Sequence, residues 1–153
     1  MFPALALLIL YHTLETVHTN ECLRLRAAGL NSHLINIFIP KCEEDGTYTA
    51  VQCHANGCYC ADEFGAPITD VDISLEEVKR TNMNCKCARD RLKYLNMIKE
   101  RPDEKNDRIF LCERNGNYAK VQCTGSVCYC VDEQGNELRS STVHISETGS
   151  VKC

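Results

Sequence analysis

Apolar residues recur at helical spacing near the start of each half of the chain. The two stripes are Leu23, Ala27, Leu30 and Leu34, and then Ala88, Leu92, Leu95 and Ile98. Steps of three and four residues place side chains on one face of a helix. We expect a short helix from about Glu21 to Ala28, because Gly29 and the polar run after it weaken the pattern. The second stripe predicts a stronger helix that ends near Arg101-Pro102, since proline cannot continue a helix.

Strand-forming residues follow each helix. In the first half, Asp45-Gly46 predicts a turn and Thr47 to Cys53 a strand. Cys58 to Asp62 is the expected partner strand, joined by a four-residue loop from His54 to Gly57. Ser74, followed three residues later by a glutamate, predicts a helical turn over Leu75 to Lys79. The tail from Ser140 to Val151 shows no clear periodic pattern.

The hairpin segment occurs twice, seventy residues apart. Val-Gln-Cys, four residues, then Cys-Tyr-Cys-x-Asp-Glu-x-Gly spans 51–65 and again 121–135. The register extends upstream and pairs Cys42 with Cys112 and Tyr48 with Tyr118. The chain is therefore an internal duplication, with a first unit at 20–85 and a second unit at 87–153, joined by Lys86 alone.

Cysteine content narrows the fold class. Of the 153 residues 12 are cysteines, and they divide into two sets of six: 22, 42, 53, 58, 60, 85 and 87, 112, 123, 128, 130, 153. Even sets at matching spacings predict a disulfide framework, which units of this size need because a small core alone is marginal. We expect two small disulfide-rich α+β modules, each with a short helix and a small antiparallel sheet. Spacing alone does not choose the pairing among the cysteines.

The N-terminal segment resembles a secretion signal. Residues from Met1 to Tyr11 are mostly apolar but too few to span a bilayer. We expect residues 1–19 to be a signal peptide cleaved between about 16 and 21; a buried N-terminal helix is the alternative. The product would be secreted, extracellular and monomeric, with no membrane span. A net charge of −4 without a basic run also argues against nucleic acid as a partner.

Neither a metal site nor an enzyme is expected. Cys58, Cys60 and nearby His54 contain zinc-ligand atoms, and a cysteine beside a histidine can form a nucleophile pair. Both uses need a free thiolate, which a disulfide removes. The acidic cluster of Asp70, Asp72, Glu76 and Glu77 lacks the glycine and spacing of a calcium loop, so it is interpreted as a solvated face. We expect no cofactor and no metal.

Gly-x-Tyr, Gln-Cys, Cys-aromatic-Cys-x-Asp and a closing cysteine, in this order, resemble the thyroglobulin type-1 repeat over residues 22–153. The resemblance implies pairing of first with second, third with fourth and fifth with sixth cysteine in each unit. The implied bridges are Cys22–Cys42, Cys53–Cys58, Cys60–Cys85, Cys87–Cys112, Cys123–Cys128 and Cys130–Cys153. Tyr59 and Tyr129 stand where the family usually has tryptophan, and the loops after Cys53 and Cys123 are shorter than is common.

Inhibition of proteases is the function that this resemblance favours. Some members, the thyropins, reversibly inhibit papain-like cysteine proteases of the cathepsin L type, and the chain shows no other module for its repeats to serve. By resemblance the contact edge comprises 31–37, 54–57 and 66–69 in the first unit, and 103–108, 124–127 and 136–140 in the second. The candidates are Leu34, Ile35, His54, Ala55, Asn56 and Gly57, with Thr124, Gly125, Ser126 and Val127. Apolar and small residues favour the first unit.

Two alternatives to protease inhibition remain. The same loops can be solvated connections without a partner, because a fold does not settle a function. The chain can also be a non-inhibitory extracellular binding protein, such as a venom or secretory-gland component.

Overall fold

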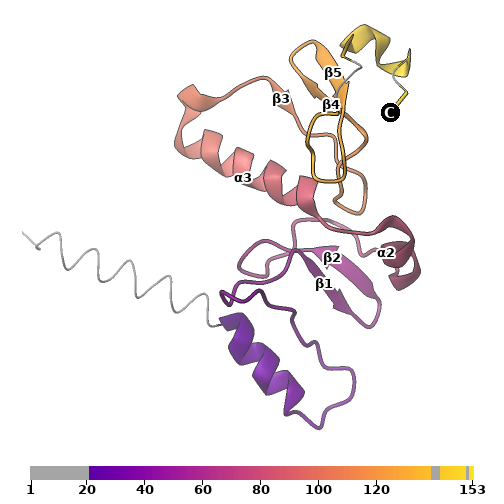
Figure 1. Cartoon of the computed structure of the whole chain (residues 1–153). Coiled ribbons are helices and arrows are strands. Elements are labelled where there is room, and N and C mark those ends of the chain that lie inside the picture. Colours follow the sequence, from indigo (N-terminus) through magenta and orange to yellow (C-terminus); the bar gives the residue numbers. More distant parts are fainter. Residues whose placement is uncertain (1–20, 139–141, 151) are drawn as a thin grey trace, which may run out of the picture.

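Two units lie end to end in the computed structural model, which describes residues 21–138, 142–150 and 152–153 (Figure 1). The expected signal peptide lies outside the described residues. A helix at 21–30 opens the described part of the first unit, and α3 (Lys86–Glu100) opens the second. Each unit then forms an antiparallel hairpin. The expectation of two small α+β modules is confirmed.

The first unit contains a two-stranded sheet of β1 (Val51–His54) and β2 (Gly57–Cys60). His54 pairs with Gly57, so the turn contains two residues, Ala55 and Asn56, and not the four that were expected. The strands are also shorter than predicted. Tyr48 and Ala61, which were expected in these strands, instead form isolated bridges with Cys42 and Pro67. Cys58 and Cys60 are buried and Tyr59 is half-buried, as strand alternation requires.

Helix α2 (Leu75–Thr81) follows this hairpin and confirms the predicted helical turn. The backbone N–H of Glu77 donates to Ser74 Oγ over 3.2 Å, so the serine caps the first turn. Asn82 ends the helix in the left-handed conformation, with φ of 48°.

The second unit forms a four-stranded sheet in the order β3-β4-β5-β6. Its hairpin, β4 (Val121–Thr124) and β5 (Val127–Cys130), repeats the register of the first. Strand β3 (Arg108–Ile109) follows the 3-10 helix η1 (Pro102–Glu104) and pairs with β4. Strand β6 (Val143–His144), followed by the 3-10 helix η2 (Ile145–Ser150), pairs with β5. The tail from Ser140 to Val151 showed no periodic pattern, so neither β6 nor η2 was predicted.

The two opening helices differ in length and in one packing residue. The helix at 21–30 is two residues longer than predicted, whereas α3 ends at Glu100 as expected. Gly29 lies within the helix, and its lack of a side chain lets Ile39 pack closely, since a Cβ there would lie 3.0 Å from Ile39 Cγ1. Counted from the first cysteine of each unit, Tyr94 holds the corresponding position, and its hydroxyl donates to the Asn106 carbonyl over 2.6 Å. In both units this position contacts the segment before the hairpin, with a glycine against Ile39 in the first unit and a tyrosine bonded to Asn106 in the second.

Disulfides supply much of each core. The six bridges are Cys22–Cys42, Cys53–Cys58, Cys60–Cys85, Cys87–Cys112, Cys123–Cys128 and Cys130–Cys153, the pairing that the resemblance implies. In the first unit Ile73 and Met83 pack with Cys58, Cys60 and Cys85. Because cross-links restrict the unfolded chain, each unit tolerates a small apolar core.

A buried glutamine holds each hairpin to the segment before it. Gln52 Oε1 accepts from the Lys41 N–H over 3.0 Å, and its amide donates to the Lys41 carbonyl over 2.8 Å. Gln122 makes the same two bonds with Leu111, at 3.0 and 2.6 Å. The repeated Val-Gln-Cys therefore encodes a repeated clamp.

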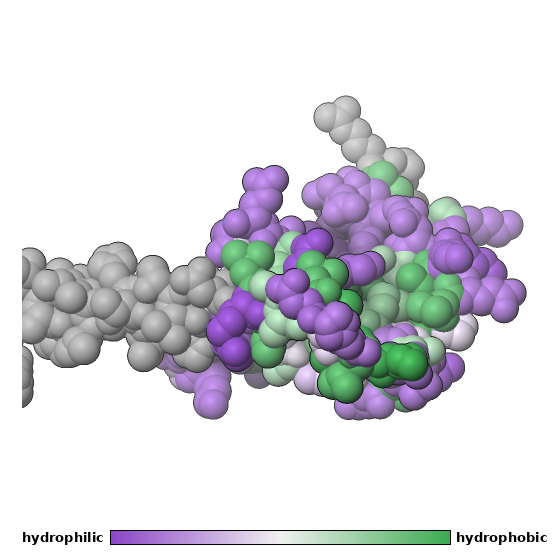
Figure 2. Space-filling view, turned by 90° about the horizontal axis from the view of Figure 1, so that it is seen from below, coloured by the Kyte–Doolittle hydropathy of each residue, from purple (hydrophilic) through white to green (hydrophobic). Residues whose placement is uncertain are grey.

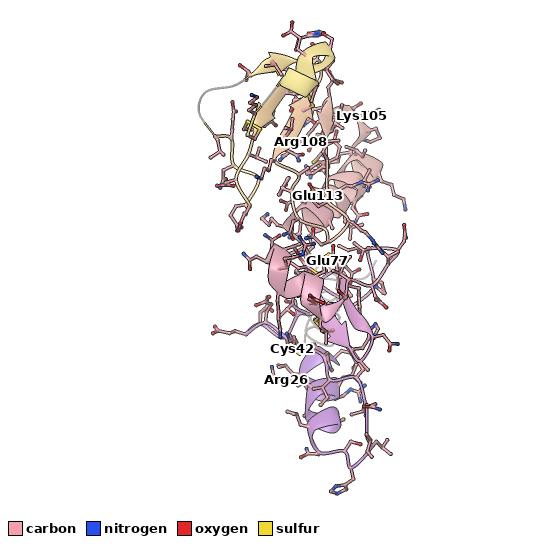
Figure 3. All side chains as sticks on the ribbon, turned by 90° about the vertical axis from the view of Figure 1, so that its right-hand side faces the viewer. Arg26, Cys42, Glu77, Lys105, Arg108 and Glu113 are labelled. Carbon is pink, nitrogen blue, oxygen red and sulfur yellow. A yellow bond between two sulfur atoms is a disulfide. The ribbon has the colours of Figure 1, made fainter. Side chains whose placement is uncertain are left out.

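The units contact each other through polar groups at their junction. Arg89 of α3 reaches into the first unit and donates to the backbone carbonyls of Tyr48, Ala61 and Asp62 at 2.7–2.9 Å. Asn117 Oδ1 accepts from the Asn84 N–H over 2.7 Å, and its amide donates to the end of α2. In Figure 3 the junction lies between Glu113, labelled in the second unit, and Glu77, labelled on α2 of the first. These bonds set the orientation of the units.

Candidate functional site

The tip of the first hairpin, residues 54–57, projects beyond a disulfide. Cys53–Cys58 joins the two strands directly before the tip, with its Cα atoms 4.0 Å apart. Ala55 and Asn56 are exposed. Gly57 is buried instead, because a Cβ there would lie 2.6 Å from the Ile73 carbonyl oxygen. The exposed part of the tip is therefore a two-residue turn on a cross-linked base.

One side of the tip borders a hollow that we call the Ile37 hollow. Its lining residues are Asn36, Ile37, Phe38, Ile39, Cys53, His54, Ala55 and Asn56. It lies where the second unit has β3, and among the described residues no strand pairs with the outer edge of β1. Its walls combine the exposed apolar side chains of Ile37, Phe38 and Ile39 with polar groups of Asn36, His54 and Asn56.

The other side of the tip borders the Asp72 hollow. It is lined by His54, Tyr59, Pro67, Thr69, Asp70, Val71 and Asp72. His54 Nε2 lies 3.2 Å from Asp72 Oδ2, and His54 Nδ1 accepts from the backbone N–H of Asn56 over 3.2 Å. Burial, and then the charges of Tyr48 and Asp72, raise the pKa of Tyr59, so its hydroxyl stays neutral. Three segments of the first unit thus meet at His54.

Leu34 and Ile35 extend the exposed apolar surface beyond these hollows. They are 72% and 90% exposed, and Leu30 is 64% exposed. Figure 2 shows hydrophobic patches between polar side chains on the face viewed from below. Exposed apolar side chains near one another are typical of interaction surfaces.

Flanking strands hold the corresponding tip of the second unit. The Gly125 N–H donates to the Asp107 carbonyl over 2.9 Å, and the Ile145 N–H donates to the Ser126 carbonyl over 2.8 Å. Val127 pairs with His144, and Thr124 pairs with Arg108. Thr124, Ser126 and Val127 are exposed, but backbone strands occupy both sides of the turn.

Comparison with known proteins shows the family. A profile of the thyroglobulin type-1 repeat matches residues 17–80 and 87–153. The chain belongs to the thyroglobulin type-1 repeat family.

Its relatives differ widely in size. The chain is 30% identical to thyroglobulin of Mus musculus over 110 residues, which cover 72% of this chain and 4% of that protein. It is 29% identical to equistatin of Actinia equina over 135 residues, 79% of this chain and 52% of equistatin. It is also 29% identical to U24-ctenitoxin-Pn1a of Phoneutria nigriventer over 140 residues, 88% of this chain and 96% of the toxin. The chain thus spans about 4% of the thyroglobulins that it matches.

The structure brings some predicted contact segments together and separates others. In this thyroglobulin type-1 chain, the first-unit segments at 31–37 and 66–69 both reach the tip, through Asn36 and Ile37 and through Pro67 and Thr69. In the second unit, Asp107 and Arg108 lie beside the tip. Asn136 instead bonds to Asp132 in its own turn, and residues 139–140 lie outside the described chain.

Two contributors to the tips escaped the sequence reasoning. Asp72 was assigned to a solvated acidic face, and Ile145 lay in a tail without a periodic pattern. Their role depends on which segments fold back against the hairpins, and spacing along the chain does not show this. One sequence feature hints at this return of the chain: Ile73 and Val143 occupy the same position of the repeat, seventy residues apart. In the structure each pairs with the second strand of its hairpin.

All twelve cysteines form disulfides. Among the described residues, no group of three His, Cys, Asp or Glu side chains is placed to hold a metal ion. Within the same residues no helix has the length and apolar character needed to cross a membrane.

Proposed function

We propose that the protein is a secreted, reversible inhibitor of papain-like cysteine proteases, and that the tip of the first unit enters the active-site cleft. The observation that carries the proposal is the convergence of 36–39, 54–56 and 67–72 at His54, which gives a narrow edge built from three chain segments. Membership in a family that includes thyropins supports the choice of partner.

Rigidity supports binding by this edge. The Cys53–Cys58 bridge restrains the hairpin, and the Gln52 clamp holds the segment before it. A restrained loop loses less conformational entropy on binding than a flexible one. The edge can therefore enter a cleft without first becoming ordered.

The first unit is the better candidate for two reasons. Hollows border both sides of its exposed turn, whereas backbone hydrogen bonds with Asp107 and Ile145 hold the turn of the second unit. Its neighbouring segment also exposes Leu34 and Ile35, whereas the corresponding segment of the second unit contains Asp103, Lys105 and Asp107. Apolar side chains cost less to desolvate in a protein cleft than charged ones.

Titration of papain and cathepsin L with the oxidised protein tests this proposal. We expect saturable inhibition with a sub-micromolar constant, measured from substrate cleavage at several inhibitor concentrations. Asn56→Lys adds bulk and charge to the exposed turn and should weaken inhibition about tenfold or more, since burying an unpaired charge is unfavourable. Ser126→Lys is the matched change in the second tip. If Ser126→Lys weakens inhibition and Asn56→Lys does not, the second unit is the inhibitory one.

A second candidate function is an extracellular binding role without inhibition. The alignment with U24-ctenitoxin-Pn1a covers nearly all of that toxin and most of this chain, which favours it. Absence of inhibition at tens of micromolar by a correctly bridged sample would contradict the inhibitor proposal and favour this one.

A further inference from the structure

The two hairpin tips are held by different kinds of bond. In the second unit, backbone hydrogen bonds with Asp107, directly before β3, and with Ile145, directly after β6, hold the turn, and no titratable side chain takes part in them. In the first unit, the side chain of His54 links Asp72 to the backbone of Asn56. Thr124 stands at the position of His54 and its hydroxyl lies 3.3 Å from the Tyr129 hydroxyl. Among the described residues, an imidazole bonds to the turn itself only at the first tip.

We propose that Asp72 is a positioning residue that acts through His54 to hold the Asn56 turn, and that protonation of His54 releases this turn. The geometry is a relay. With Nε2 protonated, the ring carries its hydrogen on the atom that lies 3.2 Å from Asp72 Oδ2, while Nδ1 keeps its lone pair and accepts from the Asn56 N–H over 3.2 Å. A neutral imidazole has one donor and one acceptor, and in this tautomer Nδ1 is the acceptor.

Protonation removes the acceptor. The imidazolium carries a hydrogen on each nitrogen, so Nδ1 can no longer accept from the Asn56 N–H. The contact between Nε2 and Asp72 persists and gains charge, so the ring stays beside Asp72 while the turn loses its bond. Histidine is the side chain whose charge ordinarily changes between pH 5 and 8, which sets the pH range of the tests below.

The groups around His54 are few. Asp72 and Asp70 face it from the 69–72 segment, and the Tyr59 ring of β2 lies 6.0 Å from the imidazole. On the opposite side, residues 36–39 carry no charge. The residues lining either hollow include no Lys or Arg.

The effect on inhibition rests on the proposed function, whereas the release of the turn does not. If the first tip enters a protease cleft, inhibition should weaken as the pH falls, because binding must then order a turn that is no longer held. The turn itself should change in the free protein whether or not a protease binds.

The first test uses the free oxidised protein. We expect a smaller hydrogen-exchange protection factor for the Asn56 amide, taken relative to an unprotected amide at the same pH, and larger backbone motion by ¹⁵N NMR at pH 5 than at pH 7.5. In His54→Asn the side-chain oxygen replaces Nδ1 as acceptor two residues before Asn56 and cannot titrate. Its Asn56 amide should therefore keep the same protection factor and the same backbone motion at both pH values. Asp72→Ala should loosen the Asn56 amide already at pH 7.5.

His144→Asn is the matched control. His144 Nδ1 accepts from the Ser146 N–H over 3.3 Å, the same local arrangement at a distance from the first tip. This variant should leave the pH response of Asn56 unchanged. An Asn56 amide that responds to pH equally in wild type and in His54→Asn would overturn the relay.

The second test measures inhibition of papain at pH 5.5 and 7.5. The ratio of inhibition constants, acid over neutral, should be about threefold or more larger for wild type and His144→Asn than for His54→Asn, as expected for loss of one hydrogen bond. Dividing by the His54→Asn ratio cancels the titration of the protease itself. Equal ratios would overturn the link between relay and binding. No inhibition by any variant would instead overturn the proposed function and leave the amide measurement to decide the relay.

Discussion

The two units share a covalent frame and differ in what surrounds it. Their disulfides, hairpin register and glutamine clamps match. Around this frame, the second unit adds strands β3 and β6, whereas the first leaves hollows beside its tip. The comparison shows that cysteine spacing specifies the hairpin but not its surroundings, which depend on residues between the motifs.

A second difference concerns the junction, where the second unit supplies most of the side chains. Arg89 and Asn117 reach across, while their counterparts Arg24 and Thr47 bond within the first unit, to Glu21 and Asp45. The two copies therefore differ at the junction, where Arg89 and Asn117 of the second unit bond to the first. Paired substitutions can test each part of this contrast.

Gly116→Ala should have the largest effect. A Cβ there would lie 2.3 Å from Cys60 Sγ, and the residue has φ of +79°. Overpacking and a left-handed backbone together should cost about 3 kcal/mol of the free energy of unfolding. Gly125→Ala, with φ of +56° and its nearest neighbour 3.8 Å away, should cost only about 1 kcal/mol. Denaturant unfolding of the oxidised variants measures both, and equal losses would contradict a tight junction.

Arg89→Ala should rank next. It removes hydrogen bonds to three carbonyls of the first unit, and loss of such charged donors should cost about 2–3 kcal/mol. Arg24→Ala, at the equivalent position of the first unit, removes a solvent-exposed ion pair and should change the unfolding midpoint little. A small loss from Arg89→Ala would mean that the junction does not depend on this side chain.

Tyr118→Phe should have the smallest effect and a distinctive pH dependence. The Tyr118 hydroxyl donates to Asp90 over 2.7 Å, a bond that contributes about 1–2 kcal/mol. Burial, followed by Asp90, raises the pKa of Tyr118 above its usual value of 10.0. Because the folded state holds this proton more tightly, the stabilisation is complete below about pH 10 and is lost as the pH rises further.

The measurement is thermal unfolding of wild type and variant from pH 7 to 11. The advantage of wild type over Tyr118→Phe should shrink above pH 10. Tyr48→Phe is the control, since within the described residues the Tyr48 hydroxyl makes no hydrogen bond, and it should change stability little. A constant difference across the range would show that the Asp90 bond does not govern titration of Tyr118.

Repeated, local patterns made most of the fold predictable. The stripe from Ala88 to Ile98 predicted α3, and the duplicated Val-Gln-Cys motif predicted both hairpins. Ser74 predicted the start of α2. These elements depend on residues close in sequence, so propensity and periodicity suffice. The four-residue turn was wrong because the close approach of Gly57 to Ile73 extends the ladder by one pair.

The candidate site was less accessible to sequence reasoning. The tip residues followed from the resemblance, and the segment containing Ile37 was placed near them. Asp72 was not, because its contact with His54 requires the chain to return to the hairpin after two turns. Gly29 likewise gave only a weakened helix signal, and its packing against Ile39 appears only when both segments are placed.

By itself, the sequence determined the duplication, the cysteine frame, the helices and the hairpins, because these depend on spacing and on side-chain type along a short stretch. Tertiary structure alone decided which tip is flanked by strands, which carboxylate meets His54 and how the second unit docks on the first. Those outcomes depend on contacts between segments far apart in the chain, such as Arg89 with Tyr48 and Asn117 with Asn84. Short-range pattern carries no information on such contacts, since each needs the fold already in place.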